Sequence, residues 1–215
     1  MPPRDLILVG AGGLGREVLW QIKESCDERY NILGFVDDAP GMVGARVDGA
    51  PVLGDVGWLA QYPKKICVAI CVANPKIRKS IYDELKANSN ISFPTIIAGD
   101  VHHSGLVKFG QGCIICLSTI LTVNVALGDF VIVNPHCSIA HDAVLGDFVT
   151  LYYNVNVAGN VRVGSGAEIG TGTSIIQGRT IGENAVVGAG SVVIRDIPAN
   201  CTAVGVPAAP IKRNA

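Results

Sequence analysis

A six-residue repeat is the feature of this sequence that most restricts its fold. Between residues 97 and 193 an apolar, mostly aliphatic residue returns at every sixth position, and only His103 breaks the series. Smaller residues form a second lane four positions later, and glycines recur every eighteen residues, as at Gly110, Gly128 and Gly146. Neither an amphipathic helix nor an alternating strand has this period.

The repeat indicates a parallel β-helix of triangular section, with three short flat sides in each coil. A coil buries one large and one small residue per side and cannot bury them alone, so many coils must stack. The glycines eighteen residues apart are expected to supply turn conformations that other residues resist. We expect two domains, residues 1–96 before the repeat and residues 97–215 with the β-helix and a C-terminal tail.

The segment before the repeat predicts a small α/β unit with a parallel sheet, a Rossmann-like domain. Apolar runs at 4–9, 32–36 and 65–72 are the expected strands. A G-x-G-x-x-G motif at residues 10–15 lies between the first strand and an expected helix. Glycines in this position allow a tight turn, and the N-terminus of the helix can face a phosphate.

The residues that follow these strands predict a nucleotide site, because ligands of open α/β sheets bind at the carboxyl ends of the strands. The acidic pair after the second strand could bind a ribose or a base. Asn74-Pro75 favours a helix start, and the basic face of that helix, which includes Arg78, is expected to be solvated. A glycine turn that serves packing alone is the alternative. The candidate residues are Gly12, Gly13, Leu14, Asp37, Asp38, Ala73 and Asn74.

Composition excludes several classes of function. A net charge of -1 and a pI near 6.4 give no electrostatic footprint for nucleic acid or an anionic membrane. The sequence contains no apolar run of the roughly 20 residues that a spanning helix needs. The first residues lack the features of a secretory signal, so we expect a cytoplasmic protein.

The seven cysteines suit a reducing compartment, and the Cys113-x-x-Cys116 pair is interpreted as buried packing rather than a metal or redox motif.

His141 is the candidate catalytic residue of the repeat. It lies two positions after the inward-facing Ile139, so its ring should point outward from a corner, with Val123 and Gly159 as neighbours one coil away. Glycine at that neighbouring position is expected to leave room for a ligand beside the ring. Asp142 could bind one imidazole nitrogen, fix the tautomer and raise the basicity of the ring, as a general base requires.

The repeat resembles the left-handed β-helix of the hexapeptide-repeat acyltransferases. With the N-terminal glycine loop, the chain resembles one subgroup over nearly its whole length. These are bacterial sugar acetyltransferases: sialic-acid O-acetyltransferases and N-acetyltransferases that act on UDP-linked 4-amino-sugars. The most specific segments are Ser138-Ile-Ala-His141-Asp142-Ala-Val-Leu-Gly146-Asp147, Val157-Ala-Gly159-Asn160-Val161 and Val204-Gly-Val-Pro207-Ala.

The resemblance implies acetyl transfer from the co-substrate acetyl-CoA to an amino or hydroxyl group of a nucleotide-linked sugar, in bacterial glycan synthesis. It makes His141 the general base and Asp142 the residue that increases its basicity. It implies no tightly bound cofactor, no metal, and a homotrimer whose CoA grooves lie between β-helices. The residues matched to the nucleotide-sugar site are Gly12, Gly13, Leu14, Asp37, Asp38 and Ala73, and those assigned to the acetyl-CoA groove are Thr150, Gly159, Thr171 and Ala189.

Two departures from the family pattern concern the substrates. Thr150 stands where related enzymes can carry a second histidine near the thioester, and Tyr152-Tyr153 replaces a smaller turn that contains glycine. The repeat is expected to place this tyrosine turn with His141 and Gly159 on neighbouring corners of one edge. The tyrosines would then reshape the mouth of the acceptor or CoA site.

Three other interpretations stay open. A β-helix metalloenzyme of the carbonic-anhydrase type would bind zinc through His136, His141 and a third imidazole gathered between subunits. An NAD-binding protein would hold its cofactor through Asp37, and a scaffold would have no activity. The N-terminal nucleotide domain and the position of Asp142 beside His141 favour the acetyltransferase.

Overall fold

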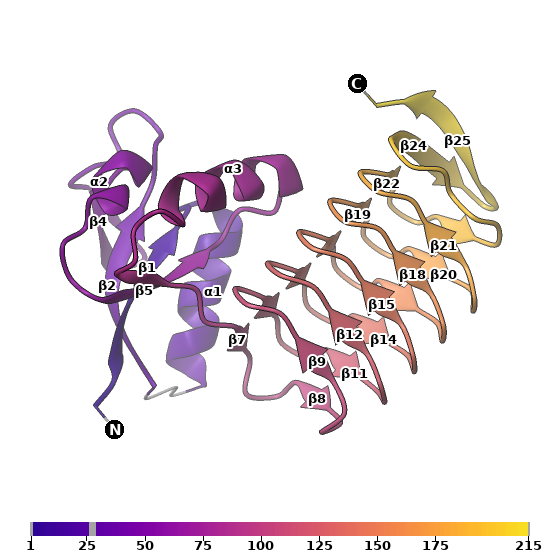
Figure 1. The fold of residues 1–215 in the computed structure, drawn as a ribbon, viewed down its shortest axis with the longest axis horizontal. Coiled ribbons are helices and arrows are strands. Elements are labelled where there is room, and N and C mark those ends of the chain that lie inside the picture. Colours follow the sequence, from indigo (N-terminus) through magenta and orange to yellow (C-terminus); the bar gives the residue numbers. More distant parts are fainter. Residues whose placement is uncertain (1, 26–28, 215) are drawn as a thin grey trace. The chain divides into compact units, whose positions relative to one another are not determined.

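The computed structural model describes residues 2–25 and 29–214, and the chain divides into two units, Met1–Ile96 and Ile97–Ala215. Figure 1 shows the first unit as a sheet with helices and the second as a stack of coils made of very short strands. This arrangement confirms the α/β unit followed by a parallel β-helix.

The first unit is built on a sheet in which strands of the described residues follow the order β3-β4-β2-β1-β5-β6. Neighbouring strands are parallel, except that β3 and β4 form an antiparallel hairpin. Leu6, Ile7 and Leu8 are wholly buried, as expected for a central parallel strand covered on both faces. The elements are β1 (Arg4–Val9), α1 (Gly13–Glu24), β2 (Tyr30–Val36), β3 (Arg46–Val47), β4 (Ala50–Gly54), α2 (Val56–Ala60), β5 (Ile66–Ile70), α3 (Pro75–Leu85) and β6 (Ile91–Ser92).

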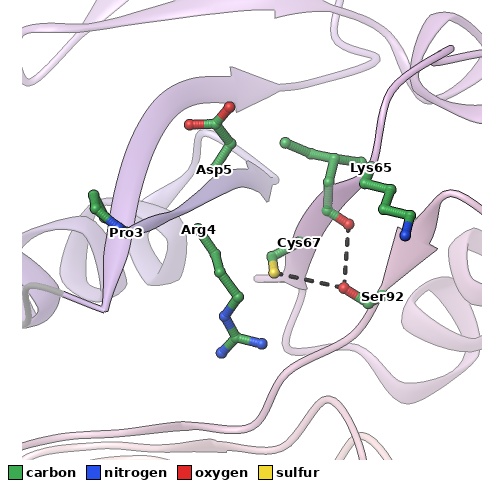
Figure 2. Close-up of a pocket in the computed structure, with 7 residues that line it drawn as sticks. Pro3, Arg4, Asp5, Lys65, Cys67 and Ser92 are labelled. Carbon is green, nitrogen blue, oxygen red and sulfur yellow. Dashed lines mark hydrogen bonds between the residues drawn. The ribbon is translucent and has the colours of Figure 1, made fainter. Parts of the chain in front are cut away.

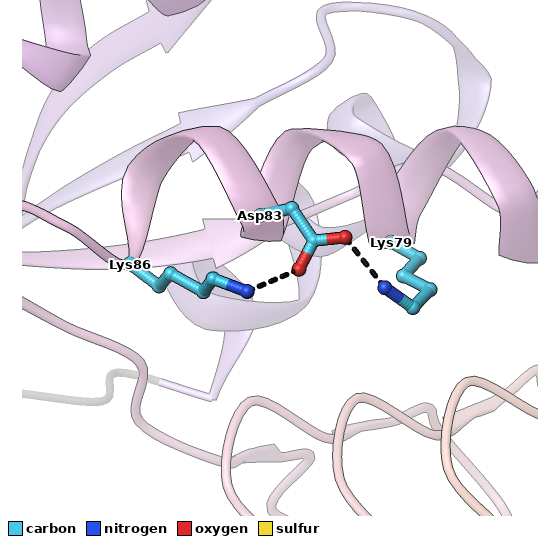
Figure 3. A network of polar contacts seen from close by, with 3 residues as sticks. All are labelled: Lys79, Asp83 and Lys86. Atoms are coloured by element: carbon cyan, nitrogen blue, oxygen red, sulfur yellow. Dashed lines mark hydrogen bonds and ion pairs between the residues drawn. The ribbon is translucent and has the colours of Figure 1, made fainter.

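Helix α3 begins as the sequence predicts. The side chain of Asn74 caps the helix by accepting a hydrogen bond from the Ile77 N–H at 3.1 Å, and proline occupies the first turn. On the exposed side of this helix Asp83 accepts hydrogen bonds from Lys79 and Lys86 (Figure 3). Because these ion pairs are exposed to solvent, they contribute little to stability.

The second unit is a triangular prism. In its described part the strands form three sheets, which we call sides 1, 2 and 3 in the order in which the chain first visits them. The first edge joins sides 1 and 2, the second edge joins sides 2 and 3, and the third edge leads from side 3 to side 1 of the next coil.

The strands of each side are spaced eighteen residues apart over most of the stack. Side 1 contains β7 (Ile96–Ile97), β10 (Ile114–Ile115), β13 (Ile132–Val133), β16 (Thr150–Leu151), β19 (Glu168–Ile169), β22 (Val186–Val187), β24 (Cys201–Gly205) and β25 (Ala208–Arg213). Side 2 contains β8 (His102–His103), β11 (Ile120–Leu121), β14 (Ser138–Ile139), β17 (Asn156–Val157), β20 (Ser174–Ile175) and β23 (Val192–Val193). Side 3 contains β9 (Lys108–Phe109), β12 (Ala126–Leu127), β15 (Val144–Leu145), β18 (Arg162–Val163) and β21 (Thr180–Ile181).

The core of the prism consists of the two lanes that the repeat predicts. Leu121 pairs with Ile139, and Ile139 with Val157, so the large residues stack directly above one another. Ala143 and Val161 of the small lane are wholly buried. His103 is exposed in the first coil and meets the Phe109 ring edge-on at 5.3 Å. Residues 201–213 close the other end as the β24–β25 hairpin.

The glycines spaced eighteen residues apart have a different role from the one predicted. Their φ angles are not positive; instead, a Cβ at Gly110 would lie 2.4 Å from the backbone oxygen of Gly128 in the next coil. Asp129 lies beside that glycine and accepts a hydrogen bond from the Gln111 N–H at 3.0 Å. Asp147 repeats the contact one coil later, accepting from the Asp129 N–H at 2.8 Å. Glycine is therefore required here because adjacent coils approach closely.

The left-handed backbone conformation occurs at another position, once at each corner from residue 112 to residue 190. Asparagine, aspartate and glycine adopt this conformation at the lowest cost, and they fill most of these corners, Asp142 among them. The corner residues, with φ between +53° and +71°, are Gly112, Ser118, Asn124, Phe130, His136, Asp142, Phe148, Asn154, Asn160, Gly166, Gly172, Gly178, Asn184 and Gly190.

The described helices are too short or too polar to cross a bilayer, since none of those within residues 2–25 and 29–214 has the required apolar length.

Candidate functional site

The first part of the candidate site is a crevice at the carboxyl ends of three strands. The Gly10 N–H donates to the Val36 oxygen and the Cys71 N–H to the Val9 oxygen, each at 2.8 Å. Strand β1 connects through α1 to β2 on one side, while β5 lies on its other side. Such a switch in direction opens a crevice between neighbouring strands where ligands of α/β sheets bind.

The glycine loop at this crevice has the geometry that the motif predicts. A Cβ at Gly15 would lie 1.9 Å from the Gly10 oxygen, so only glycine lets α1 start so close to β1. Gly12 and Gly13 are exposed, with open space where a side chain would be. Gly12 is the N-cap and provides no side-chain cap, and the first turn contains no acidic residue. The first N–H groups of α1, near Leu14, suit an anionic group.

The two predicted acidic residues hold the loops around the crevice. Asp37 Oδ2 accepts from the Ala11 N–H at 2.8 Å and its Oδ1 from the Ala39 N–H at 2.9 Å. Asp38 Oδ1 accepts from the Val56 N–H at 2.8 Å, at the start of α2. The carboxylates therefore fix the glycine loop and the loop after β2, a structural role that the sequence did not indicate.

A residue pair that the sequence interpretation missed joins the β3–β4 hairpin to α1. Arg16 donates from Nε to Asp48 Oδ2 at 2.8 Å and from Nη2 to Oδ1 at 3.2 Å. The hydrogen bond from Arg16 lowers the pKa of Asp48. Asp48 and Gly49 both have positive φ, as in a two-residue hairpin turn. In the sequence, this Asp-Gly pair is the signal that predicts the hairpin turn and so places Asp48 at its tip.

Arg78 also departs from the prediction. It was expected on a solvated basic face, but it is 0% exposed. Its Nη1 donates to the Val72 oxygen at 2.6 Å and to the Ala73 oxygen at 2.8 Å. Ala73 was a predicted nucleotide-site residue, so the buried guanidinium contacts the backbone of the candidate site.

The second part of the candidate site lies on the second edge of the prism. Nδ1 of His141 is 2.9 Å from Oδ2 of Asp142, and the two side chains are 56% and 45% exposed. Asn124, one coil earlier, donates from Nδ2 to Asp142 Oδ1 at 3.1 Å. The hydrogen bond from His141, and then the one from Asn124, lower the pKa of Asp142.

This geometry selects one tautomer of His141. An ionised Asp142 can only accept hydrogen bonds, so Nδ1 of the imidazole carries the proton and Nε2 keeps its lone pair. The second edge thus presents a basic nitrogen whose orientation is fixed by a carboxylate. Asn124 was missed in the sequence, although it precedes Asp142 by one coil of eighteen residues.

Gly159 provides space, but not for a ligand as predicted. A Cβ at this position would lie 2.4 Å from Nε2 and 2.5 Å from Cε1 of His141. The imidazole itself therefore occupies the room that glycine leaves, and Gly159 is buried.

The remaining predicted CoA residues lie elsewhere on the prism. Thr171 and Ala189 are exposed on the first edge, in register with Tyr153. Thr150 is wholly buried in β16. Within one copy these three residues do not meet His141, because side 2 separates the two edges.

The expectation that the tyrosine turn shares an edge with His141 is therefore wrong. Each six-residue step moves the chain to the next edge, and Tyr153 follows His141 by two steps. On the first edge Tyr152 donates from its hydroxyl to Glu168 Oε2 at 2.9 Å.

The histidines of the zinc interpretation, which places its site between subunits, do not meet within one copy. His136 is exposed on the first edge and His141 on the second. Within residues 2–25 and 29–214, no three His, Cys, Asp or Glu side chains form a group that could hold a metal ion. Cys113 and Cys116 are buried and not joined by a disulfide.

A cavity of about 320 Å³ lies at the opposite, amino-terminal ends of β1 and β5 (Figure 2). Among its lining residues, Ser92 donates from its hydroxyl to the Ile66 oxygen and to Cys67 Sγ. None of the predicted site residues lines it; the lining residues are Pro3, Arg4, Asp5, Lys65, Ile66, Cys67 and Ser92.

Comparison with known proteins places the chain in a family. The family model for the PglD N-terminal domain matches residues 5–85. The acetyltransferase domain of PglB from Neisseria gonorrhoeae FA1090, solved in complex with acetyl coenzyme A, is 31% identical with a TM-score of 0.89. The match covers 97% of this chain and 100% of that domain. The chain belongs to the hexapeptide-repeat sugar acetyltransferases.

Two further members are similar. A perosamine N-acetyltransferase from Caulobacter crescentus, with a histidine replaced by asparagine and in complex with CoA and GDP-perosamine, is 28% identical with a TM-score of 0.87; 96% of each chain is covered. GDP-perosamine N-acetyltransferase of Escherichia coli O157:H7 is 33% identical over 152 residues, which span 66% of this chain and 65% of that protein. The family resemblance and the left-handed β-helix expected from the sequence are thereby confirmed.

Proposed function

We propose that this protein transfers the acetyl group of acetyl-CoA to an amino group of a sugar linked to a nucleoside diphosphate. The observation that carries the proposal is the His141–Asp142 pair on the second edge, with Nε2 left as the basic nitrogen. The relatives support it, since one is named for GDP-perosamine N-acetylation and another was solved with acetyl-CoA.

The chemistry is a direct transfer between two bound substrates. The acceptor nitrogen attacks the thioester carbonyl while Nε2 of His141 takes its proton, and Asp142 stabilises the imidazolium that forms. The tetrahedral intermediate then expels the CoA sulfur, which receives the proton from His141. We assign the Gly159 N–H as a donor to the oxyanion, because backbone donors near the imidazole suit this role.

The two units divide the binding of the substrates. The uncapped start of α1 and the backbone around Asp37, Asp38 and Ala73 suit the nucleotide part of the acceptor. For acetyl-CoA we propose a groove with Gly159 and His141 on one wall and Thr171 and Ala189 on the other. Thr150 enters this groove only through a rearrangement that uncovers it.

One groove can contain both walls only if two copies meet. The second edge of one copy must then lie beside the first edge of another, which is a head-to-tail interface. A closed ring of three copies satisfies every such edge and provides three equivalent grooves, so we propose a homotrimer.

The test is a CoA-release assay with acetyl-CoA and a panel of GDP- and UDP-linked amino sugars, with free sialic acids for the O-transfer alternative. We expect turnover with an amino sugar and a loss of about 100-fold or more in His141→Ala. Because the His141 side chain is exposed, the variant should keep the melting temperature of the wild type.

The same preparation tests the other interpretations. Thermal-shift measurements with NAD, UDP, GDP and CoA should show a higher melting temperature with UDP or GDP and with CoA, but not with NAD. Stoichiometric zinc, or turnover that is unchanged in His141→Ala, would contradict the proposed function.

A further inference from the structure

Arg78 is the most unusual buried group in the first unit. An arginine is always charged, and removing it from water is strongly unfavourable unless polar groups surround the guanidinium. Here the side chain is wholly buried, and its Nη1 donates to two successive carbonyl oxygens, those of Val72 and Ala73. Those carbonyls belong to the segment that leads from β5 into α3.

This segment forms one wall of the crevice at the carboxyl ends of the strands. A Cβ at Gly10, at the end of β1, would lie 3.0 Å from the Cys71 oxygen and 3.2 Å from Cγ2 of Val72. The glycine loop and the segment after β5 are therefore immediate neighbours. Whatever fixes the backbone of residues 72–74 also shapes this crevice.

The two hydrogen bonds from Arg78 orient the peptide groups of this wall. In a trans peptide the C=O and N–H point in opposite directions. Because the oxygens of Val72 and Ala73 face the guanidinium, the N–H groups of Ala73 and Asn74 point away from it. The side-chain oxygen of Asn74 caps α3, so on the side away from Arg78 the segment presents backbone N–H groups.

We propose that Arg78 is a positioning residue of the nucleotide-sugar site. It holds the segment 72–74 so that successive N–H groups face acceptor oxygens of the nucleotide, and its charge behind these peptides strengthens them as donors. The inference rests on the proposed function, in that the crevice binds the nucleotide part of the acceptor. Arg78 itself does not touch the substrate.

The first experiment compares Arg78→Lys and Arg78→Met with Lys79→Met in the full chain. Lys79 is an exposed cation on the same helix and serves as the matched control. Titration calorimetry measures the binding of UDP and GDP, and steady-state kinetics separates KM for the nucleotide sugar from KM for acetyl-CoA. The melting temperature of each variant reports folding.

We expect Arg78→Lys to weaken nucleotide binding and raise KM for the nucleotide sugar about tenfold or more. The lysine nitrogen lies one bond short of the position of Nη1, which donates to both oxygens, and an ammonium is more strongly hydrated than a guanidinium. KM for acetyl-CoA and kcat should not change, and Arg78→Met should show the larger effect. A merely structural role would instead lower the amount of active protein and leave both KM values unaltered, which would overturn the inference.

The second experiment uses the wild type and does not depend on the folding of variants. Hydrogen exchange of the amides of Ala73 and Asn74 should slow in the presence of UDP or GDP. Unchanged exchange at saturating nucleotide would overturn the inference even if the protein acetylates sugars. Conversely, protection of these amides without any acetyl transfer would sustain the inference and refute the proposed function.

Discussion

At the scale of single residues, the state of Asp142 determines how His141 can act. Its carboxylate receives hydrogen bonds from His141 Nδ1 and Asn124 Nδ2, and both favour the ionised form and lower its pKa. A carboxyl whose pKa is lower in the folded state stabilises the fold above its unfolded pKa. That contribution is lost as the pH falls through the folded pKa.

Asn124→Ala should raise the pKa of Asp142 toward the ordinary value of about 3.9, because the ionised form loses one donor. Carboxyl NMR titration measures this change directly. The stability that depends on Asp142 should then be smaller, and its loss should be complete at a higher pH than in the wild type, because only the folded-state pKa has risen. An unchanged titration midpoint would show that Asn124 has no influence on Asp142.

Gly159→Ala tests whether the ring of His141 must lie where it does. The new Cβ would overlap with the imidazole of His141. Because this ring is exposed, it can move aside at little cost to the stability of the fold. Since a misplacement of about 1 Å can cost about 100-fold in rate, we expect kcat to fall 10- to 100-fold with little change in the melting temperature. Wild-type kcat in this variant would show that the position of the ring is not critical.

At the scale of elements, glycine serves the β-helix in two distinct ways. Gly128, on the third edge, is required by proximity, since a Cβ would lie 2.7 Å from the Asp147 nitrogen in the next coil. Gly172 has a φ of +71° and open space around it. The first position excludes any side chain, whereas the second excludes only residues that resist the left-handed conformation.

Gly128→Ala should therefore lower the free energy of unfolding by about 1–3 kcal/mol, because backbones of adjacent coils must separate. Gly172→Asn should change it by less than about 0.5 kcal/mol, since asparagine tolerates this conformation. Denaturant titration of both variants provides the comparison. Equal losses would mean that the two glycines have the same role.

At the scale of the whole molecule, the proposed trimer makes catalysis depend on assembly, because its groove needs two edges that lie apart in one copy. His141→Ala removes the proposed base from the second edge, and Ala189→Trp should block the first edge. Neither variant should be active alone. In a ring assembled from both in equal amounts, about one quarter of the grooves should combine an intact second edge with an intact first edge.

Co-expression of the two variants, with a different tag on each, checks this expectation by the activity of the purified mixed assembly. Light scattering of the wild type should give the mass of three copies. A monomeric wild type, or a mixed assembly without activity, would contradict the shared groove.

The sequence by itself determined the β-helix, because a six-residue period over about a hundred residues is compatible with few structures and each lane records which side chains face inward. It also indicated the α/β unit, its glycine loop and the pairing of His141 with Asp142, which are neighbours in the chain. Only the tertiary structure decided how neighbouring coils and loops use these residues. The ring of His141 fills the space over Gly159, Asn124 binds Asp142, Arg78 is buried against two carbonyls, and Tyr153 lies on a different edge from His141. These relations depend on distances across coils and on the direction of each side chain, which a linear pattern does not specify.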